Sequence, residues 1–331
     1  MPRVSEQTYC AKPKVSVTMI TYNHEKFIAQ AIESVLMQET DFPVELIIGE
    51  DCSTDSTRQI VKAYAEKHPD VIRALLPERN LGMQRNGAAV LQACRGEYVS
   101  PLEGDDYWTA PDKLQRQVEF LTTHPELSLC HHAVEYVRWE GGARHVLQSF
   151  PPESCRGTRQ AMDLIGGNFI QTCSLMLRRD CLPAMDASFL SLKLGDWPIC
   201  YLVAERGGIG FLDKVMADYR IHDSNCWNAL ASVTRQYETA RMAFYLATVA
   251  KPVAQAAWHQ SGLDLIRLVL EKQSTLLGAI RKALAIWLSG CLPLSQALRL
   301  LTRDMKNRLN TGLRRHPRAF AVLKRMLHPY R

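Results

Sequence analysis

Residues 97–108 read EYVSPLEGDDYW, an apolar strand that runs directly into an acidic turn. Three carboxylates, those of Glu103, Asp105 and Asp106, stand there within four residues. Like charges at this spacing repel and raise one another's pKa, whereas a divalent cation, which prefers oxygen ligands, removes that cost. The stretch therefore predicts a metal site at the end of a strand. The alternative is an acidic turn that caps a helix starting near Pro111.

The residues before this stretch alternate between strand and helix patterns. Residues 15–20 and 44–48 are rich in β-branched side chains and read as strands. Residues 25–37 carry apolar side chains at helical spacing, and a further strand and helix are expected at 72–76 and 87–93. Such alternation predicts an α/β fold with a mostly parallel sheet flanked by helices and connected by right-handed crossovers.

Polar residues follow the expected strands at the points where they end. They are Tyr22 and Asn23, then Asp51, and then the acidic turn at residues 103–106. Because the carboxyl ends of parallel strands meet at one edge, we expect these side chains to converge there. A phosphate-bearing ligand with a divalent metal fits such an edge. The chain lacks both a G-x-x-x-x-G-K-[ST] loop and a G-x-G-x-x-G after the first strand, which argues against an ATPase and a dinucleotide dehydrogenase.

The pattern changes after Pro111. We expect helices at residues 112–123 and 198–204, and strands at 127–132, 169–177 and 208–215, with a hairpin turn at 140–142. From Asn228 onward only helices are expected, with breaks near Lys251-Pro252, Gly262 and Pro293. The chain is accordingly divided into residues 1–111, 112–227 and 228–331, the last being a helical, basic extension.

Composition indicates the cellular compartment of the protein. The 331 residues are 47% apolar, which is ordinary for a globular chain. Ten cysteines occur without any C-x-x-C pair, which favours a reducing compartment over a disulfide framework. The first 14 residues lack an apolar signal core, and no run of 18 apolar residues occurs. We therefore expect a cytoplasmic protein without a transmembrane helix.

The net charge of +6 is concentrated in the C-terminal tail. Residues 301–331 hold nine Lys or Arg against one Asp. Apolar residues between Leu298 and Leu309 fall on one helix face and basic residues on another, a pattern that suits an anionic membrane surface. Peripheral attachment to the inner face of the cytoplasmic membrane is one expectation, and docking of this helix on its own body or on a partner is the other. No nucleic-acid partner is expected, because no reader motif accompanies the charge.

Seven short motifs, in this order and spacing, resemble those of a family 2 glycosyltransferase of the GT-A fold, of the type that builds bacterial surface polysaccharides. The resemblance covers roughly residues 14–227. The matching stretches are VTMITYN at 17–23, IIGEDCSTD at 47–55, NLG at 80–82, GEYV at 96–99, EGDDYW at 103–108, GDW at 195–197 and YRIH at 219–222. Two departures occur, since Glu103 stands where the motif usually has Asp, and Arg85 falls out of the usual register for a phosphate contact.

The resemblance implies a nucleotide-binding role for residues at the first two strand ends. Asp51 would hydrogen-bond the base of the donor, usually uracil. Thr21, Tyr22 and Asn23 would line the pocket for the base and the ribose. The implied fold is a Rossmann-like, mostly parallel GT-A sheet flanked by helices, with residues 1–111 as its nucleotide-sugar half and residues 112–227 as its acceptor half.

The resemblance also implies the residues of the chemical step. Asp105 would be the metal-binding acid of the D-x-D motif, and Asp106 beside it would contact sugar or ribose. His222 would lie near the diphosphate or the metal, which would be Mn²⁺ or Mg²⁺. Asp196 would be the general base that deprotonates the acceptor hydroxyl, a poor nucleophile that needs a carboxylate within hydrogen-bond reach.

The expected function is an inverting transfer of a sugar from a nucleotide-diphosphate donor, usually UDP-linked, to a glycan or lipid-linked acceptor. One base and one metal suffice for inversion, and the cation offsets the charge that the leaving diphosphate gains. The alternative is a protein without catalysis, either a nucleotide-sugar or glycan binding module, favoured by the departure at Glu103, or a membrane-docked scaffold, favoured by the tail.

Overall fold

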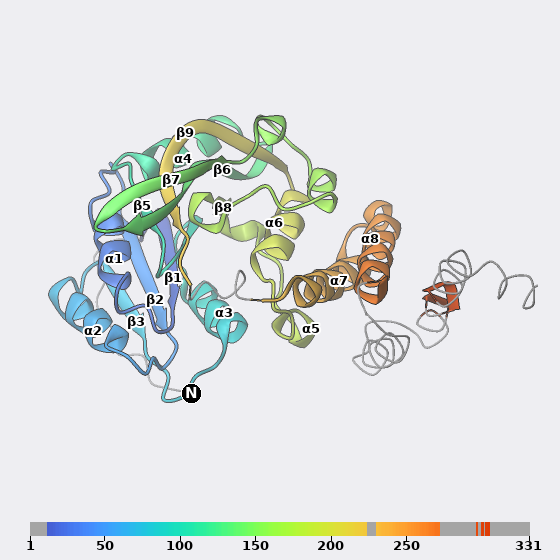
Figure 1. Ribbon diagram of the computed structural model, residues 1–331. Coiled ribbons are helices and arrows are strands. Elements are labelled where there is room, and N and C mark those ends of the chain that lie inside the picture. Colours follow the sequence, from blue (N-terminus) through green and yellow to red (C-terminus); the bar gives the residue numbers. More distant parts are fainter. Residues whose placement is uncertain (1–11, 224–229, 272–295, 297–298, 301, 305–331) are drawn as a thin grey trace, which may run out of the picture. The chain divides into compact units, whose positions relative to one another are not determined.

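Figure 1 shows the chain in a computed structural model. The structure describes residues 12–223, 230–271, 296, 299–300 and 302–304. It divides into two compact units, Met1–Ala229 and Leu230–Arg331. The fold of each unit is given separately below.

The first unit is built on a parallel sheet. Its four strands lie in the order β3-β2-β1-β4 and pair in parallel throughout. Thr21 lies opposite Glu50, and Ile20 opposite Glu103, so the polar strand ends meet at one edge as the sequence predicts. The strands are β1 (Val15–Thr21), β2 (Val44–Glu50), β3 (Ile72–Leu75) and β4 (Tyr98–Glu103).

Three helices connect these strands. Helices α1 (Ile28–Leu36) and α2 (Thr57–Lys67) lie on one side of the strands and α3 (Met83–Ala93) on the other (Figure 1). This follows from right-handed crossovers, because the chain steps outward from β1 to β3 and then back to β4. Helix α1 turns its periodic apolar residues inward, and each fully buried Ile or Val stabilises the fold by about 1.5–3 kcal/mol.

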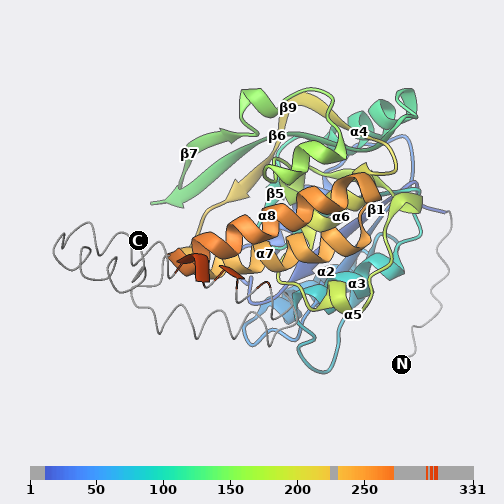
Figure 2. The same cartoon turned by 90° about the vertical axis from the view of Figure 1, so that its right-hand side faces the viewer.

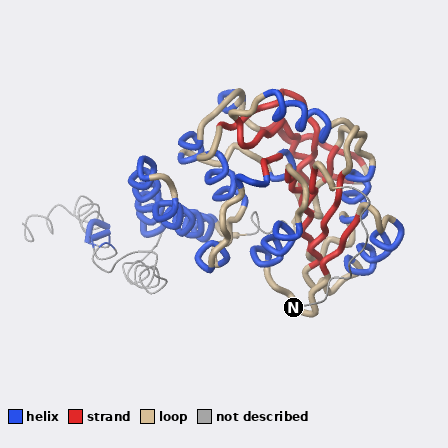
Figure 3. Tube along the Cα trace, turned by 180° about the vertical axis from the view of Figure 1, so that it is seen from behind, coloured by secondary structure: helices blue, strands red, loops and turns tan. Residues whose placement is uncertain are grey.

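The rest of the first unit continues the same sheet in the order β4-β8-β6-β9-β5, with β7 pairing with β6 off this path. Figure 3 shows the strands as one curved layer with helices around it. The β6–β7 hairpin extends away from the rest of the unit (Figure 2). These elements are β5 (Tyr107–Trp108), α4 (Lys113–Thr123), β6 (Leu127–Glu140), β7 (Ala143–Phe150), β8 (Met176–Arg178), α5 (Ala187–Leu190), α6 (Asp196–Ala204) and β9 (Gly208–Arg220).

Two expectations for this half need correction. The strand expected at residues 169–177 forms only at Met176–Arg178, because Thr172–Ser174 make a 3₁₀ turn, in which Ser174 N donates to Gln171 O. The strand expected at 208–215 continues to Arg220, because β9 pairs with β6 on one side and with β5 on the other.

The pairing of β5 with β9 positions the site. Tyr107 lies opposite Asp218 and Trp108 opposite Ala217, in antiparallel register. Strand β5 begins directly after Asp105 and Asp106, and β9 ends two residues before His222. The acidic turn and the YRIH motif are therefore brought together by backbone hydrogen bonds between two distant segments.

The second unit contains a helical hairpin of α7 (Ser232–Val249) and α8 (Pro252–Glu271). The break at Lys251-Pro252 is confirmed, and Pro252 occupies the first turn of α8, where its missing N–H is not needed. The break expected at Gly262 is wrong. Gly262 lies inside α8, where a Cβ atom would lie 2.7 Å from the ring of Phe244, so this glycine allows α7 and α8 to pack closely.

Pro293 and most of the tail helix expected at residues 298–309 lie outside the described residues. In the part of the chain that the structure describes, no helix is both long and apolar enough to cross a membrane.

Candidate active site

Asp105 and His222 form the centre of the polar edge. His222 Nε2 lies 3.1 Å from Asp105 Oδ2, and His24 Nε2 lies 3.8 Å from the same oxygen. Burial alone would raise the pKa of Asp105, but the hydrogen bond with His222 and the two histidine charges outweigh it, so the pKa lies below its ordinary value. The carboxylate is therefore held in its charged form, the form that binds a cation.

Asp106 points into the protein. Its side chain is 1% exposed, and its Oδ1 atom accepts a hydrogen bond of 2.8 Å from Arg220 N. Burial, followed by the charges of Asp105 and Glu103, raises its pKa well above the ordinary value. Asp106 thus fastens the acidic turn to β9. Its contact with sugar or ribose stays a prediction, and would require this carboxylate to become accessible.

Arg220 stabilises the acidic turn through its side-chain contacts. Its guanidinium lies between the rings of Phe27 and Tyr107, 4.8 and 4.6 Å from their centroids. It donates to the backbone oxygen of Asp105 and, over 2.6 Å, to Gln30 Oε1. The sequence analysis assigned no role to Arg220. Its place within the YRIH motif, beside His222, could have indicated that it lies at the site.

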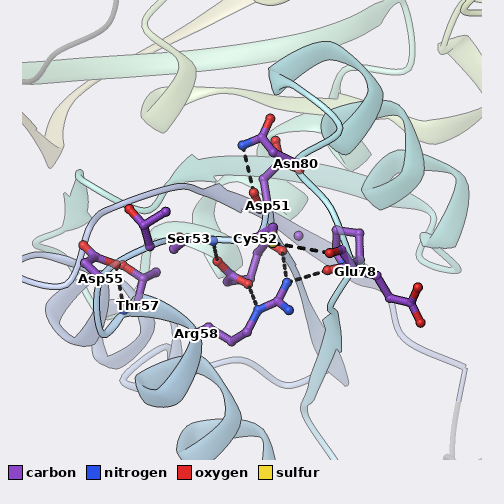
Figure 4. A network of polar contacts seen from close by, with 12 residues as sticks. Asp51, Cys52, Ser53, Asp55, Thr57, Arg58, Glu78 and Asn80 are labelled. Carbon is purple, nitrogen blue, oxygen red and sulfur yellow. Dashed lines mark hydrogen bonds and ion pairs between the residues drawn. The ribbon is translucent and has the colours of Figure 1, made fainter.

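Asp51 ties the end of β2 to the segment before α3 (Figure 4). Its two carboxylate oxygens accept hydrogen bonds of 2.7 and 2.9 Å from the backbone nitrogens of Leu81 and Gly82. Asn80 Nδ2 donates to the backbone oxygen of Asp51 over 2.9 Å. Each carboxylate oxygen has two acceptor sites, but the side chain is 3% exposed, so a hydrogen bond with a base would require this carboxylate, like that of Asp106, to become accessible.

A second network holds the loop that follows Asp51 (Figure 4). Glu50 accepts hydrogen bonds from Ser53 N, at 2.6 Å, and from Arg58 Nε, and Arg58 also donates to Pro77 O over 2.7 Å. Cys52 has a φ of 60° at the tip of this loop. The buried charge of Glu50 is thereby paired, as a buried carboxylate requires, and the loop is fixed beside the edge.

The three residues expected to line the nucleotide pocket have different environments. Thr21 is buried and its Oγ1 lies 3.2 Å from His24 Nδ1. Asn23 has a φ of 56°, and its Oδ1 accepts a hydrogen bond of 2.8 Å from Thr54 N. Tyr22 is 42% exposed. Tyr22 and Asn23 are therefore both exposed to a ligand, whereas Thr21 is buried, and Asn23 also holds the loop through its bond to Thr54.

Asp196 is the first residue of α6 and is half-buried. Asn168 Nδ2 donates to its Oδ2 atom over 3.3 Å. Burial raises the pKa of Asp196 above its ordinary value. Burial and then the charges of Asp105 and Asp196 raise the pKa of Glu103 to about 8, so Asp196 lies within electrostatic reach of the acidic turn. A carboxylate with a raised pKa is a stronger general base.

The residues at the acidic turn supply some, but not all, of the ligands that a divalent cation needs. Among the described residues, no group of three or more His, Cys, Asp or Glu is arranged as a complete metal site. Asp105 and His222 supply one carboxylate and one imidazole. Mg²⁺ and Mn²⁺ at nucleotide sites take one or two protein ligands and complete their coordination with substrate phosphates and water. The pair therefore fits a cation that binds together with a diphosphate.

Sequence comparison identifies the family. The model described as glycosyl transferase family 2 matches residues 16–183. An uncharacterised protein of Mycobacterium tuberculosis is 39% identical over 227 residues, which cover 69% of this chain and 64% of that protein. An uncharacterised glycosyltransferase of Nostoc is 32% identical over 241 residues, covering 70% and 71% of the two chains. A putative teichuronic acid biosynthesis glycosyltransferase of Bacillus subtilis, TuaG, is 40% identical over 110 residues, covering 33% and 42%.

Solved structures show the same fold. The fragment 1–349 of TarS of S. aureus, in a crystal structure with UDP-GlcNAc, aligns with a TM-score of 0.53 over 90% of this chain and 92% of that fragment, at 18% identity. A mannosyltransferase of Pyrobaculum calidifontis in complex with GDP-Man and Mn²⁺ aligns with the same TM-score over 91% and 81%, at 17% identity. Both confirm the expected GT-A sheet. With a family model that matches half of its residues and these relatives, the chain belongs to glycosyl transferase family 2.

Proposed function

We propose that this protein is a metal-dependent, inverting glycosyltransferase. It moves a sugar from a nucleotide-diphosphate donor, UDP-linked, to a hydroxyl of a glycan or lipid-linked acceptor. The observation that carries this proposal is the pairing of Asp105 with His222 at 3.1 Å on the same edge as the strand ends that precede Tyr22 and Asp51. Such an edge holds a charged diphosphate through a cation and its nucleoside through polar loops.

Donor binding uses polar residues that follow the ends of β1, β2 and β4. The base contacts Asp51, and Tyr22 packs on the nucleoside. Asp105 and His222 would hold a divalent cation, Mn²⁺ or Mg²⁺, which would supply charge compensation for the departing diphosphate. Arg220 holds the backbone of the acidic turn in place through its hydrogen bond to the backbone oxygen of Asp105.

The transfer step is a single displacement. Asp196 accepts the proton of the acceptor hydroxyl, whose oxygen forms a bond to the anomeric carbon as the bond from that carbon to the diphosphate oxygen breaks. The electron pair of the broken bond leaves with the nucleoside diphosphate. Asn168 orients the base through its hydrogen bond to Asp196 Oδ2. One displacement inverts the anomeric centre.

The proposed biological setting is the assembly of a surface polysaccharide in the cytoplasm. It is supported by the similarity to TuaG, a putative teichuronic acid biosynthesis glycosyltransferase. Residues 1–111 form the donor half, residues 112–227 the acceptor half, and the basic tail within residues 228–331 brings the enzyme to the anionic inner face of the membrane. Loss of vesicle sedimentation on deletion of residues 296–331 tests the role of the tail, and unchanged binding to anionic vesicles contradicts it.

Turnover of nucleotide sugars tests the proposed function. The purified full chain is incubated with UDP- and GDP-linked sugars and Mn²⁺, and release of nucleoside diphosphate is followed with and without glycan acceptors. We expect release from one donor class, stimulated by an acceptor and abolished by a chelator. Nucleotide-sugar binding without any release would instead support a binding module. A product that retains the anomeric configuration of the donor would contradict the single displacement.

A further inference from the structure

Gln84, the second residue of α3, packs against the residue that precedes the proposed base. A Cβ atom on Gly195 would clash with Gln84 Oε1 and would lie 3.0 Å from its Nε2 atom. Gly195 is joined directly to Asp196. The end of the Gln84 side chain therefore lies beside the start of α6, and a side chain at position 195 would push it aside.

The amide nitrogen of Gln84 is buried without a hydrogen-bond partner in the described part of the chain. Leaving such a donor unsatisfied destabilises the folded protein, and most buried polar groups in native proteins are paired. The carboxamide carries two donors and one acceptor, so it is suited to an oxygen of a polar ligand.

The residues just before Gln84 contact Asp51, the proposed nucleotide contact. The backbone nitrogens of Leu81 and Gly82 donate to the carboxylate of Asp51. Gly82 caps α3 with a φ of 84°, and Gln84 follows two residues later. Gln84 thus lies near both Asp51, the proposed contact of the base, and Asp196, the proposed general base. A nucleotide sugar that reaches from one to the other brings its sugar ring to the Gln84 amide.

We propose that Gln84 is a specificity-determining residue whose Nε2 atom donates a hydrogen bond to a hydroxyl or carbonyl oxygen of the transferred sugar. The inference rests on the proposed function and adds the residue that distinguishes the donor sugar. Sites built to hydrogen-bond a substrate group reject analogues that lack it, because the protein group is then left unpaired. Gly195 leaves the amide in its present position, from which a Cβ atom would displace it.

The test compares the affinities of a nucleotide and its sugar conjugate. Titration calorimetry measures UDP and a panel of UDP-sugars with Mn²⁺ on the wild type, Gln84→Met and Gln92→Met. Met keeps the length of the side chain and removes the amide, and Gln92 is an exposed glutamine of the same helix. We expect Gln84→Met to weaken the best UDP-sugar by roughly tenfold, about one lost hydrogen bond, and to leave UDP unchanged. Gln92→Met should change neither affinity.

Gly195→Ala gives a second variant, because its methyl group displaces the amide without removing it. It should likewise weaken the UDP-sugar and spare UDP. Equal losses for UDP and UDP-sugar, or no loss for either, in a Gln84→Met protein that folds would overturn the assignment to the sugar. If the wild type binds no nucleotide and no nucleotide sugar, the proposed function itself fails, which is a different result.

Discussion

His222 Nε2 and Asp105 Oδ2 lie 3.1 Å apart although 117 positions separate the two residues in the chain. Their contact depends on the pairing of β5 with β9 and on the hydrogen bond from Arg220 N to Asp106 Oδ1. Residues that are distant in the chain therefore meet at the proposed site. A change that loosens the β5–β9 pairing should weaken metal binding even when both ligands remain.

Arg220→Met tests the support that the guanidinium gives to the acidic turn, and it leaves the backbone hydrogen bond from Arg220 N in place. The guanidinium bonds to Asp105 O and Gln30 Oε1 and stacks on two rings, whereas Met keeps only the apolar stem. We expect a loss of about 2 kcal/mol in the free energy of unfolding, since hydrogen bonds of a charged group are removed. Urea denaturation measures the stability, and electron paramagnetic resonance of Mn²⁺ in the presence of UDP should show weaker binding. Wild-type values for both would contradict a supporting role.

Asp196→Asn should separate binding from chemistry. The amide keeps the shape and the contact with Asn168 but cannot accept the acceptor proton. We expect kcat to fall by roughly 10²–10⁴-fold with little change in donor affinity. Steady-state kinetics and donor titration check this, with Asp213→Asn, an exposed aspartate paired with Arg156, as the control. Near-normal turnover in Asp196→Asn would mean that another residue acts as the base.

Gly104→Ala should distort the polar strand ends, because its methyl group would overlap with neighbouring side chains. A Cβ atom there would lie 2.6 Å from Thr21 Oγ1 and 3.1 Å from His24 Nδ1. Overpacking of this kind costs about 1–3 kcal/mol in the free energy of unfolding, and donor affinity should fall with it. Gly87→Ala is the matched control, because nothing lies within 4 Å of its Cβ position inside α3. Helix propensity predicts that this control is stabilised by up to about 1 kcal/mol. Equal effects of the two changes would disprove the steric account.

Lys113 should make stability depend on pH. Its ammonium is fully buried, bonds to Ser100 Oγ and Gln117 Oε1, and lies 3.9 Å from the Trp108 ring centroid. Burial lowers the pKa of Lys113 from 10.5 to about 7. Between these values the unfolded chain binds the proton and the folded chain releases it, so stability rises as pH increases from about 7 to 10.5.

Lys113→Met removes this titration. Melting temperatures of wild type and variant, measured between pH 6.5 and 10, should show that the wild type gains stability relative to the variant as pH rises. A constant difference across this range would show that the folded and unfolded pKa values of Lys113 are alike.

Sequence patterns were sufficient for the parallel strands and the polar edge. Runs of β-branched residues form β1 and β2, and parallel pairing by itself brings Thr21, Glu50 and Glu103 to one side. The acidic turn and the short motifs then indicated a glycosyltransferase. These features are local, or follow from a general rule for parallel sheets.

Features that depend on tertiary contacts were not predictable. Strand β5 has two residues, too few for any periodicity, yet it sets the position of His222. The helix through Gly262 persists because packing on Phe244 outweighs helix propensity. The contact of Gln84 with Gly195 joins residues that no sequence spacing relates.

A thermal-shift panel tests the central claim, that Asp105 and His222 bind a cation together with the donor diphosphate. Melting temperatures are measured with UDP, GDP and their sugar conjugates, with and without Mn²⁺, on the wild type, Asp105→Asn, His222→Ala and the control His145→Ala on the exposed strand β7. The account predicts that one nucleotide stabilises the wild type and His145→Ala only when Mn²⁺ is present, and that both site variants lose this effect. Stabilisation that is independent of Mn²⁺, or that survives in Asp105→Asn, would contradict it.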